Sequence, residues 1–268
     1  MSIKIAANAW VDPKAEIDSD VEIGPFCVVS AGARIAAGTR LINSVTIMGR
    51  VDIGRNNVIY PGCVIGGEPQ DISYGGTETL VEIGDGNVIR EGVTINRASE
   101  KEDGVTRLGS KNFLMACAHV AHDCKVGDHV IIANGSMLGG HVHVEDRASI
   151  SGGVAVHHYA TIGGYSFVGG VSRVLHDAPP FMLLEGSPAR PRCINIVALK
   201  RNGFDAKEID CLAEAHRLLY RSKVGVQAAK EILGNADRIT PGVARLFDFI
   251  GGQAEGRHGR GRDLRRAA

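Results

Sequence analysis

Residues 17–35 read IDSDVEIGPFCVVSAGARI, with an aliphatic side chain at Ile17, Ile23, Val29 and Ile35. A spacing of six fits neither the 3.6-residue period of a helix nor the two-residue alternation of a strand. The same spacing holds at Ile5, Val11, Ile17, Ile23, Val29, Ile35, Leu41, Ile47, Ile53, Ile59 and Ile65, at Ile83, Ile89 and Ile95, and at Leu108, Leu114, Val120, Val126, Ile132, Leu138, Val144, Ile150, Val156, Ile162, Val168 and Val174. Such fixed self-similarity predicts a solenoid of hexapeptide repeats.

The other positions of the hexad predict its geometry. A small or β-branched residue stands four positions after most of these aliphatic anchors, as at Cys27 and Ala33. Glycine often follows the anchor directly, as at Gly24 and Gly54, where it eases a corner of the backbone. Three such sides close a triangular coil of three hexads, so the fold is expected to be mainly β, a parallel β-helix. Adjacent coils then lie ~4.8 Å apart, and a residue becomes the neighbour of the one three hexads further along the chain.

The repeat spans residues 1–190 and is interrupted twice. In the first interruption Asp71 and Thr77 occupy anchor positions, where they do not suit an aliphatic core, so we expect a loop over residues 66–82. In the second, a polar segment breaks the spacing of six, which predicts a loop over residues 96–107. Long excursions from a rigid scaffold often carry binding residues. The alternative role for either loop is a subunit contact.

The chain changes character after the repeats. Residues 191–255 carry apolar side chains at helical spacing, with Gly234 and Pro241 as breakers, and predict a small α-helical domain. Residues 256–268 are rich in arginine and glycine and nearly devoid of large apolar side chains. We therefore expect a disordered basic tail.

The composition narrows the class of protein. Lysine plus arginine equals aspartate plus glutamate at 30 each, so no overall charge favours nucleic acid or a membrane surface. No apolar run reaches the ~20 residues of a transmembrane helix, and no secretory leader is recognisable, so the expected location is the cytoplasm. Cys27, Cys63 and Cys124 occupy the small position of the hexad, which favours a structural role over disulfides or a metal site.

Eight of the ten histidines fall between residues 119 and 176. By the stacking rule of three hexads, His122 stacks under Gly140 and Gly140 stacks under His158, with His141 beside the glycine. We call these four residues the histidine ridge. Any single histidine on a solenoid could be a solvated surface residue, but the group together favours a functional site.

The ridge offers the parts of an acyl-transfer site. A histidine can remove a proton from an alcohol, Asp123 adjoins His122 and could hold its imidazolium, and a glycine N–H can receive an oxyanion. One alternative is a zinc hydratase, in which His119, His122 and His141 would bind the metal together with water. The γ-class carbonic anhydrases do this on the same kind of β-helix. A structural solenoid that binds a partner is a third hypothesis, although it would not need the ridge.

Several motifs resemble one family. They are IGPFCV at 23–28, Gln70-Asp71, VEIGD at 81–85, IREGVTI at 89–95, MACAHVAHD at 115–123, LGGHV at 138–142 and LKRNGF at 199–204. Together they resemble the UDP-N-acetylglucosamine O-acyltransferases of lipid A biosynthesis, from the first coil through the helical domain. The resemblance implies a homotrimeric left-handed β-helix with a C-terminal helical domain, an exception to the usual right-handed crossover. Such enzymes move a 3-hydroxyacyl group from acyl carrier protein to the sugar 3-hydroxyl of UDP-N-acetylglucosamine, without a cofactor or metal.

The resemblance also assigns residues. His122 corresponds to the general base, Asp123 to the residue that orients it, and Gly140 to the donor that receives the thioester oxyanion. The substrate-binding positions of the family match Gln70, Asp71, His119, His141, His157, His158, Asn195 and Arg201. The arginine suits phosphate because its guanidinium is a fork of donors.

A groove for the acyl chain is implied as well. Gly170 matches the position that limits chain length in the family, Gly152 stacks one coil beneath it, and Phe167 lies close enough to shorten the groove. Basic residues of the C-terminal region are expected to attract the acidic carrier protein. They are Lys200, Arg217, Arg221 and Lys223.

Five positions depart from the family pattern, namely Ser73, Asn96, His158, Val197 and Asn202. The acceptor could therefore be the related 3-amino sugar nucleotide that some members use, which would give an amide. The sister N-acyltransferase of the pathway is another alternative, but it carries an extra N-terminal domain, whereas the hexads here begin at Ile5.

Overall fold

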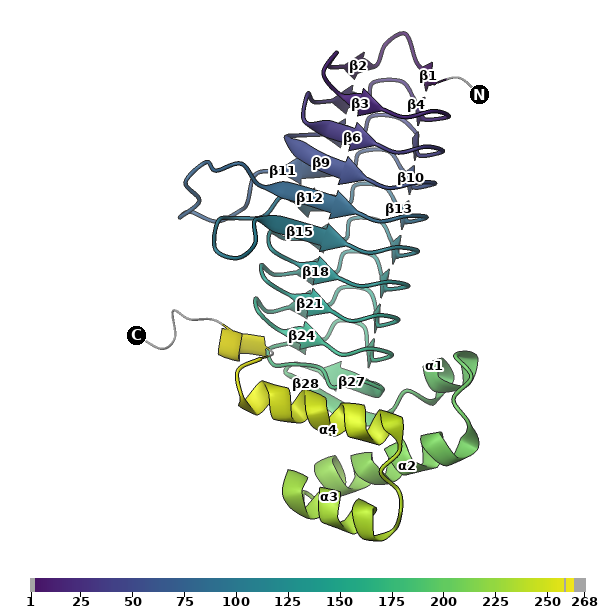
Figure 1. Ribbon diagram of the computed structural model, residues 1–268, viewed down its shortest axis with the longest axis vertical. Coiled ribbons are helices and arrows are strands. Elements are labelled where there is room, and N and C mark those ends of the chain that lie inside the picture. The colour runs from purple at the N-terminus through teal and green to yellow at the C-terminus, as the bar shows by residue number, and fades with distance from the viewer. Residues whose placement is uncertain (1–2, 258, 263–268) are drawn as a thin grey trace.

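The computed structural model describes residues 3–257 and 259–262. The hexads form a three-sided parallel β-helix, in which very short strands from successive coils pair side by side (Figure 1). Away from the two loops the register is three hexads, as between Lys125 and His143 and between His143 and Thr161. The coil of three hexads predicted from the aliphatic anchors is therefore the repeating unit.

Each side of the prism is one sheet. Sheet A consists of β1 (Lys4–Ile5), β4 (Glu22–Ile23), β7 (Arg40–Leu41), β10 (Val58–Ile59), β13 (Val88–Ile89), β16 (Phe113–Leu114), β19 (Ile131–Ile132), β22 (Ser149–Ile150), β25 (Phe167–Val168), β27 (Met182–Gly186) and β28 (Ala189–Ile194). Sheet B consists of β2 (Trp10–Val11), β5 (Val28–Val29), β8 (Thr46–Ile47), β11 (Val64–Gly67), β14 (Thr94–Asn96), β17 (His119–Val120), β20 (Met137–Leu138), β23 (Ala155–Val156) and β26 (Arg173–Val174). Sheet C consists of β3 (Glu16–Ile17), β6 (Ala33–Ile35), β9 (Arg50–Ile53), β12 (Leu80–Ile83), β15 (Val105–Leu108), β18 (Lys125–Val126), β21 (His143–Val144) and β24 (Thr161–Ile162). Paired strands are parallel except for β27 and β28, which form an antiparallel hairpin.

The aliphatic anchors fill the interior of the prism. Ile47, Ile65 and Leu138 are fully buried, and burying such a side chain contributes about 1.5–3 kcal/mol relative to leaving it exposed. Cys63 and Cys124 are buried free thiols at the small position of the hexad. Burial raises the pKa of the Cys63 thiol to about 11 and that of Cys124 to about 12. Neither is a reactive thiolate, which agrees with a structural role.

The corner between sheets B and C has an unusual backbone. Asp123, His141 and Tyr159 stand in successive coils and adopt the left-handed conformation, with φ of 61°, 62° and 64°. Residues other than glycine keep this conformation only where the surroundings hold them. Hydrogen bonds between coils do so here, because the His141 N–H donates to the His122 carbonyl and the Tyr159 N–H to the Gly140 carbonyl, each at 3.0 Å. The corner is therefore a rigid column of side chains.

Two loops leave the prism on the same side (Figure 1). The first runs over residues 68–79 between β11 and β12, and the second over residues 97–104 between β14 and β15. Across the first loop Val58 pairs with Val88, and across the second Val88 pairs with Phe113, both further apart in the chain than three hexads. The insertions therefore leave the stacking of the coils intact.

The two loops contact each other. Lys101 of the second loop forms an ion pair with Asp71 of the first. The Glu100 carboxylate accepts hydrogen bonds from the Gly75 N–H and the Thr77 hydroxyl, each at 3.1 Å. The loops thus form a single wall beside the prism.

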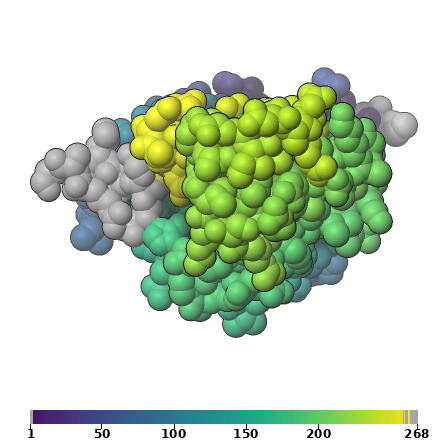
Figure 2. Space-filling model, turned by 90° about the horizontal axis from the view of Figure 1, so that it is seen from below, coloured from purple at the N-terminus to yellow at the C-terminus, as the bar shows by residue number. Residues whose placement is uncertain are grey.

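Helical segments follow the prism. They are α1 (Ile196–Arg201), α2 (Ala206–His216), the π-helix η1 (Arg217–Arg221), α3 (Val226–Asn235) and α4 (Pro241–Ala254). Asn195, Asp205 and Thr240 cap α1, α2 and α4 by accepting a backbone N–H. Viewed from below, these helices cover the end of the prism (Figure 2), and Arg245 of α4 bonds Glu145 of the prism at 2.8 Å. Within the described residues no helix is long and apolar enough to cross a membrane.

The segment expected to be a disordered tail, 256–268, contains a regular element. Gly259–Arg262 form a 3-10 helix, η2, beside β24 (Figure 1). The structure differs here from the expectation because composition alone does not register the contacts that η2 makes with the prism. Residues 258 and 263–268 of the expected tail lie outside the described residues.

Candidate active site

The histidine ridge lies at the corner between sheets B and C. His122 and Asp123 stand on the turn that joins β17 to β18. The next coil places Gly140 and His141 at the same turn, and the coil after that places His158 there, in the column held by the hydrogen bonds described above. The stacking rule of three hexads therefore located the ridge correctly.

His122 and Asp123 form a close pair. Nδ1 of His122 is 2.8 Å from Oδ2 of Asp123, whose side chain is fully buried, while the His122 side chain is 11% exposed. Asp123 also accepts hydrogen bonds from the N–H and the hydroxyl of Ser99. Burial raises the pKa of the Asp123 carboxyl, but the hydrogen bonds from His122 and Ser99 outweigh it and hold that pKa below its ordinary value. Asp123 is therefore favoured as a carboxylate, which contacts Nδ1 of His122 and not Nε2 on the other side of the ring.

Gly140 lies directly beneath the His122 ring. A Cβ atom added at Gly140 would be 2.5 Å from Cε1 and 2.7 Å from Nε2 of His122, closer than real contacts allow. Among the described residues, the Gly140 N–H donates to no group. The absence of a side chain lets the His122 ring rest on the backbone, next to an N–H that is left to donate to a bound group.

His141 lies between two carboxylates. Its Nδ1 is 3.0 Å from Oε1 of Glu102 on the second loop, and its Nε2 is 3.6 Å from Oδ2 of Asp123. Its ring stacks on Tyr159, with centroids 4.3 Å apart and planes 1° apart, and meets the His122 ring edge-on. His141 is 2% exposed, and its Nε2 has no hydrogen-bond partner among the described residues. This nitrogen is enclosed, and the polar group that it faces is the Asp123 carboxylate.

Two further histidines, His119 and His157, lie beside the ridge on the same edge of the prism. Nδ1 of His119 is 2.7 Å from the Thr94 hydroxyl, and burial followed by the nearby His122 lowers the pKa of His119. The neutral imidazole is therefore favoured at that position. The rings of His157 and His158 are 3.8 Å apart one coil beyond Gly140. These side chains extend the ridge along the prism.

Asp71 and Gln70 belong to the first loop. Asp71 accepts hydrogen bonds from the Ser73 N–H and hydroxyl, at 2.9 and 2.8 Å. The hydrogen bond from Lys101 holds the pKa of Asp71 well below its usual range. Gln70 is exposed. Because Lys101 precedes Glu102 in the chain, the second loop connects Asp71 to the ridge.

Asn195 and Arg201 lie on a different side of the prism. Together with Phe167 they line a pocket of about 550 Å³ that extends along sheet A beside α1. Asn195 caps α1 by accepting the Ala198 N–H at 3.2 Å, and its amide donates to the Tyr165 carbonyl at 2.8 Å. No ridge residue lines this pocket. Within one chain, the predicted site residues therefore fall into two groups on separate faces.

Gly170 borders the same pocket. It is exposed, and a Cβ added there would make ordinary contacts, 3.4 Å from the Gly152 carbonyl oxygen and 3.6 Å from Oγ of Ser151, which lines the pocket. Phe167 stands in β25, three residues before Gly170, and is half-buried. A longer side chain at position 170 would thus avoid a steric clash at its first carbon and would lie next to the pocket.

Sequence reasoning missed the loop residues that contact the ridge. Ser99 and Glu102 hold Asp123 and His141, and Lys101 pairs with Asp71. The one available signal was the concentration of polar side chains in this loop. It does not specify partners, because the loop has no repeat register.

The profile of the family described as UDP-N-acetylglucosamine O-acyltransferase, domain 2, matches residues 177–261, and that of the bacterial transferase hexapeptide (six repeats) matches residues 106–140. An acyl-[acyl-carrier-protein]--UDP-N-acetylglucosamine O-acyltransferase of Thermodesulfovibrio yellowstonii is 45% identical over 247 residues, 92% of this chain and 96% of the relative. The enzyme of the same name from Syntrophobacter fumaroxidans is 44% identical over 255 residues, 95% of this chain and 99% of the relative. This chain belongs to the UDP-N-acetylglucosamine O-acyltransferase family.

A solved member of the family has the same fold. The UDP-N-acetylglucosamine acyltransferase of Bacteroides fragilis superposes with a TM-score of 0.89 at 35% identity, covering 92% of this chain and 96% of that one. The left-handed β-helix expected from the resemblance is thereby confirmed, as is the assignment of the chain to the acyltransferases.

Several departures from the family pattern have partners in this structure. Ser73 donates its hydroxyl to Asp71 at 2.8 Å, beside the ion pair of Asp71 with Lys101. The Asn96 amide donates to the Glu68 carbonyl at 2.5 Å and so holds the first loop. Asn202 accepts a hydrogen bond from Arg147 at 2.7 Å, and Val197 is 59% exposed at the edge of the 550 Å³ pocket.

The structure brings together a different set of candidate metal ligands from the three histidines considered for a zinc hydratase. Among the described residues, His122, Asp123 and His141 offer ligand atoms within 4.8 Å of one another. His119 does not belong to this group, so the three histidines considered from the sequence do not converge. In the observed group Nδ1 of His122 and Nε2 of His141 both approach Oδ2 of Asp123, at 2.8 and 3.6 Å.

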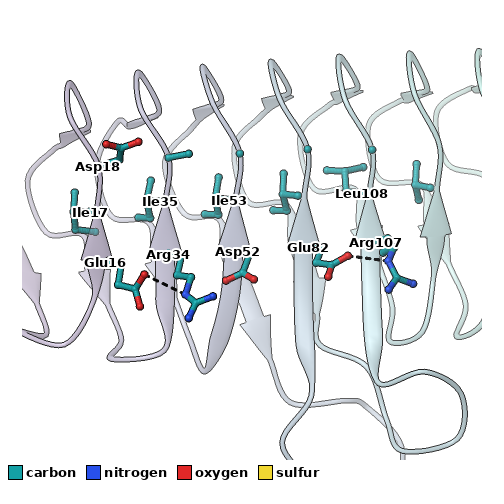
Figure 3. A pocket seen from close by; sticks show the side chains of 16 residues that line it. Glu16, Ile17, Asp18, Arg34, Ile35, Asp52, Ile53, Glu82, Arg107 and Leu108 are labelled. Carbon is teal, nitrogen blue, oxygen red and sulfur yellow. Dashed lines mark hydrogen bonds and ion pairs between the residues drawn. The ribbon is translucent and has the colours of Figure 1, made fainter.

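A larger pocket of about 890 Å³ lies on sheet C and contains none of the predicted site residues (Figure 3). Two ion pairs cross neighbouring strands there, Glu16 with Arg34 at 3.3 Å and Glu82 with Arg107 at 2.8 Å. Asp18 and Asp52 also line the pocket, so its charges are only partly paired.

Proposed function

We propose that this protein transfers a 3-hydroxyacyl group from acyl carrier protein to the 3-hydroxyl of UDP-N-acetylglucosamine, the first step of lipid A biosynthesis. The observation that carries the proposal is the His122–Asp123 pair, 2.8 Å apart, over the bare backbone of Gly140. A base, its orienting carboxylate and an oxyanion donor are the groups that acyl transfer to an alcohol requires. The names of the relatives state transfer of an acyl group from acyl carrier protein to an oxygen of UDP-N-acetylglucosamine.

The chemistry follows from these groups. Nε2 of His122 takes the proton of the sugar 3-hydroxyl as its oxygen attacks the thioester carbonyl. The oxyanion of the tetrahedral intermediate accepts a hydrogen bond from the Gly140 N–H. When the intermediate collapses, the carbon–sulfur bond breaks, and the departing thiolate of the carrier protein takes the proton back from His122. Asp123 holds the imidazolium in the meantime without receiving a proton itself.

The acceptor sugar is proposed to bind along the ridge. His141 lies beside Gly140 in the ridge, and His119, His157 and His158 extend the same edge. Gln70 and Asp71 would contribute from the loop wall. If the acceptor were the 3-amino analogue, the same base would serve an amine and the product would be an amide.

We also propose a homotrimer whose active sites lie between subunits. Outward-facing side chains differ between the sides of the prism. Sheet C carries charged side chains at Glu16, Arg34, Asp52, Glu82, Arg107 and Lys125. Apolar side chains stand on sheet B at Trp10, Val28, Val64 and Met137, and on the later strands of sheet A at Phe113, Ile131, Phe167 and Leu183. Exposed apolar faces indicate contacts, and Trp10 and Met137 are 55% and 51% exposed. A repeated contact between sheet A of one subunit and sheet B of the next is heterologous, and we propose that it closes as a ring of three. This packing would bring Asn195 and Arg201 of one chain beside the ridge of its neighbour.

The activity is tested by incubating the purified protein with UDP-N-acetylglucosamine or its 3-amino analogue and a panel of 3-hydroxyacyl carrier proteins. The product mass identifies the acceptor and the acyl length together. His122→Ala should lower turnover by about 10²–10⁴ while the oligomer persists, because His122 lies outside the aliphatic core. Near-normal turnover of that variant would refute the assignment of the base.

A mixing experiment tests the shared site. His122→Ala and Arg201→Ala are each expected to be inactive, but co-expression should restore part of the activity, because mixed trimers contain some sites with both native residues. Co-expression without any recovery would place the two residues in one chain's site. Sedimentation should give the mass of three chains.

The proposal also makes a statement about metal dependence and one about cellular location. No metal is required, so dialysis against a chelator should leave the rate unchanged, and restoration of a lost rate by zinc would favour the hydratase alternative. A cytoplasmic location is proposed because the donor is an acyl carrier protein, and cell fractionation tests it.

A further inference from the structure

The C-terminal helix η2 docks on the prism at a defined place. The Gly259 N–H donates to the Thr161 hydroxyl at 3.2 Å. Gly259 has a φ of +61°, and a Cβ added there would be 2.2 Å from Oδ1 of Asp177. Both observations require glycine at this position. The contact therefore fixes where Arg262, at the end of η2, reaches the prism.

Arg262 inserts at the corner beside the ridge. Its Nη2 donates to the carbonyls of His141, at 2.6 Å, and Tyr159, at 2.9 Å, which are neighbours in successive coils. Its Nη1 is 2.8 Å from Nε2 of His143. Arginine has donors only, so this histidine nitrogen accepts. One guanidinium, with a side chain 14% exposed, thus satisfies three acceptors.

The same guanidinium reaches the groups that hold the His141 ring. Its Nη1 is 3.6 Å from Oε1 of Glu102, the atom that lies 3.0 Å from Nδ1 of His141. Its Cζ is 5.7 Å from the centroid of the Tyr159 ring, which stacks on His141. Arg262 therefore touches the backbone of His141, its carboxylate partner and its stacking partner.

We propose that Arg262 is a positioning residue that fixes the His141 ring, and the second loop through Glu102, for binding of the acceptor sugar nucleotide. The proposal rests on the proposed function, in which that acceptor binds along the ridge beside His141. Arg262 acts through His141 and does not touch the substrate. The C-terminal segment thereby becomes part of the construction of the active site.

A purely structural role is the competing explanation. A clip between η2 and the prism would affect thermal stability and leave the kinetic constants unchanged. A positioning role instead affects the acceptor selectively, because Asp123, Gly140 and the carrier-protein surface keep their own contacts. The two explanations therefore predict different changes in KM for the two substrates.

The kinetic test compares Arg262→Ala and Arg262→Lys with a control, Arg257→Ala, whose side chain is 63% exposed and pairs only with Glu255 among the described residues. For Arg262→Ala we expect KM for UDP-N-acetylglucosamine to rise about tenfold, because charged hydrogen bonds are lost, while KM for the acyl carrier protein is unchanged. Arg262→Lys should recover only part of the loss, since a single ammonium cannot reproduce the fork. Millimolar guanidinium should rescue the alanine variant. Equal KM values in Arg262→Ala and the control, or equal loss for both substrates, would overturn the proposal.

Hydrogen exchange measured without substrate tests the role of Arg262 independently of enzyme activity. Amides of residues 97–104 and 138–144 should exchange faster in Arg262→Ala than in the wild type, and Arg257→Ala should match the wild type. Unchanged protection in Arg262→Ala would show that the guanidinium does not hold the loop. If the wild type transfers no acyl group, the proposed function fails, and the exchange comparison alone decides the role of Arg262.

Discussion

The His122 ring rests on the α-carbon of Gly140, so closely that a methyl group at position 140 would lie 2.5 Å from Cε1 of the ring. The ring cannot retreat far, because Nδ1 is held 2.8 Å from Asp123. Gly140→Ala should therefore break the pair and lower turnover by about 10²-fold or more, the scale on which general-base catalysis operates. Steady-state rates of the purified variant measure the effect.

Gly234→Ala is the matched control for this substitution. Gly234 lies in α3, and an added Cβ meets nothing within 4 Å. The control should keep the wild-type rate, and its stability should rise slightly, because alanine favours the helix by about 1 kcal/mol over glycine. If Gly140→Ala retains the control's rate, the ring does not need its place over the backbone.

The Asp123 carboxyl predicts a pH dependence of stability. Burial raises its pKa, but hydrogen bonds from His122 and Ser99 outweigh burial and lower it in the folded state. A group of this kind stabilises the fold fully above its unfolded pKa of ~3.9 and loses the contribution as the pH falls through the folded value. The wild type should therefore melt above Asp123→Asn at neutral pH, with a gap that narrows below about pH 4. The comparison uses melting midpoints at one chain concentration, and a constant gap down to pH 2 would contradict it.

The sequence was sufficient to predict the three-sided prism because its aliphatic residues recur at a fixed period. Each aliphatic anchor specifies one inward position, and the stacking of every third hexad then places His122, Gly140 and His158 in one column. The two interruptions were visible for the same reason, as losses of the period around Asp71 and before Leu108.

The partners of the ridge were not predictable in this way. Glu102 is 39 residues from His141, and Arg262 is 121 residues away, with no repeat to set the register of either. A polar loop and an arginine-rich end are compatible with solvent exposure, and only the fold determines which side chain meets the ridge. Arg262 was therefore assigned to a disordered tail, although its guanidinium bonds the corner.

The basic residues near the helical domain predict salt-dependent capture of the carrier protein. Lys200, Arg217, Arg221 and Lys223 are exposed, although Glu214 neutralises Arg217 at 2.7 Å. Lys200→Glu and Lys223→Glu should raise KM for the acidic carrier protein at low salt more than Arg217→Glu does. The difference should fade at physiological ionic strength, where the screening length is ~8 Å.

The control for charge reversal is Lys14→Glu. Lys14 is exposed in the turn between β2 and β3, strands that lie at the end of the prism opposite the helices (Figure 1). Its reversal changes the net charge equally but should not alter KM. If all the reversals have the same effect, steering depends on overall charge and the docking surface lies elsewhere.

The position of Gly170 leads to a prediction about what limits the length of the acyl chain. A side chain at this position borders Ser151 and the pocket that Phe167 lines, and its first carbon has room, at 3.4 Å from the nearest atom. Gly170→Met should therefore fold normally and obstruct the end of the groove. Each buried methylene contributes ~0.8 kcal/mol, so blocking two should change the rate ratio of long to short donors by about tenfold in favour of the shorter one. Gly170→Ala, which adds a single methyl, is the control and should barely alter the ratio, whereas Phe167→Ala should shift it toward longer donors. Initial rates across the 3-hydroxyacyl carrier proteins give the profile, and an unchanged profile in Gly170→Met would place the end of the groove elsewhere.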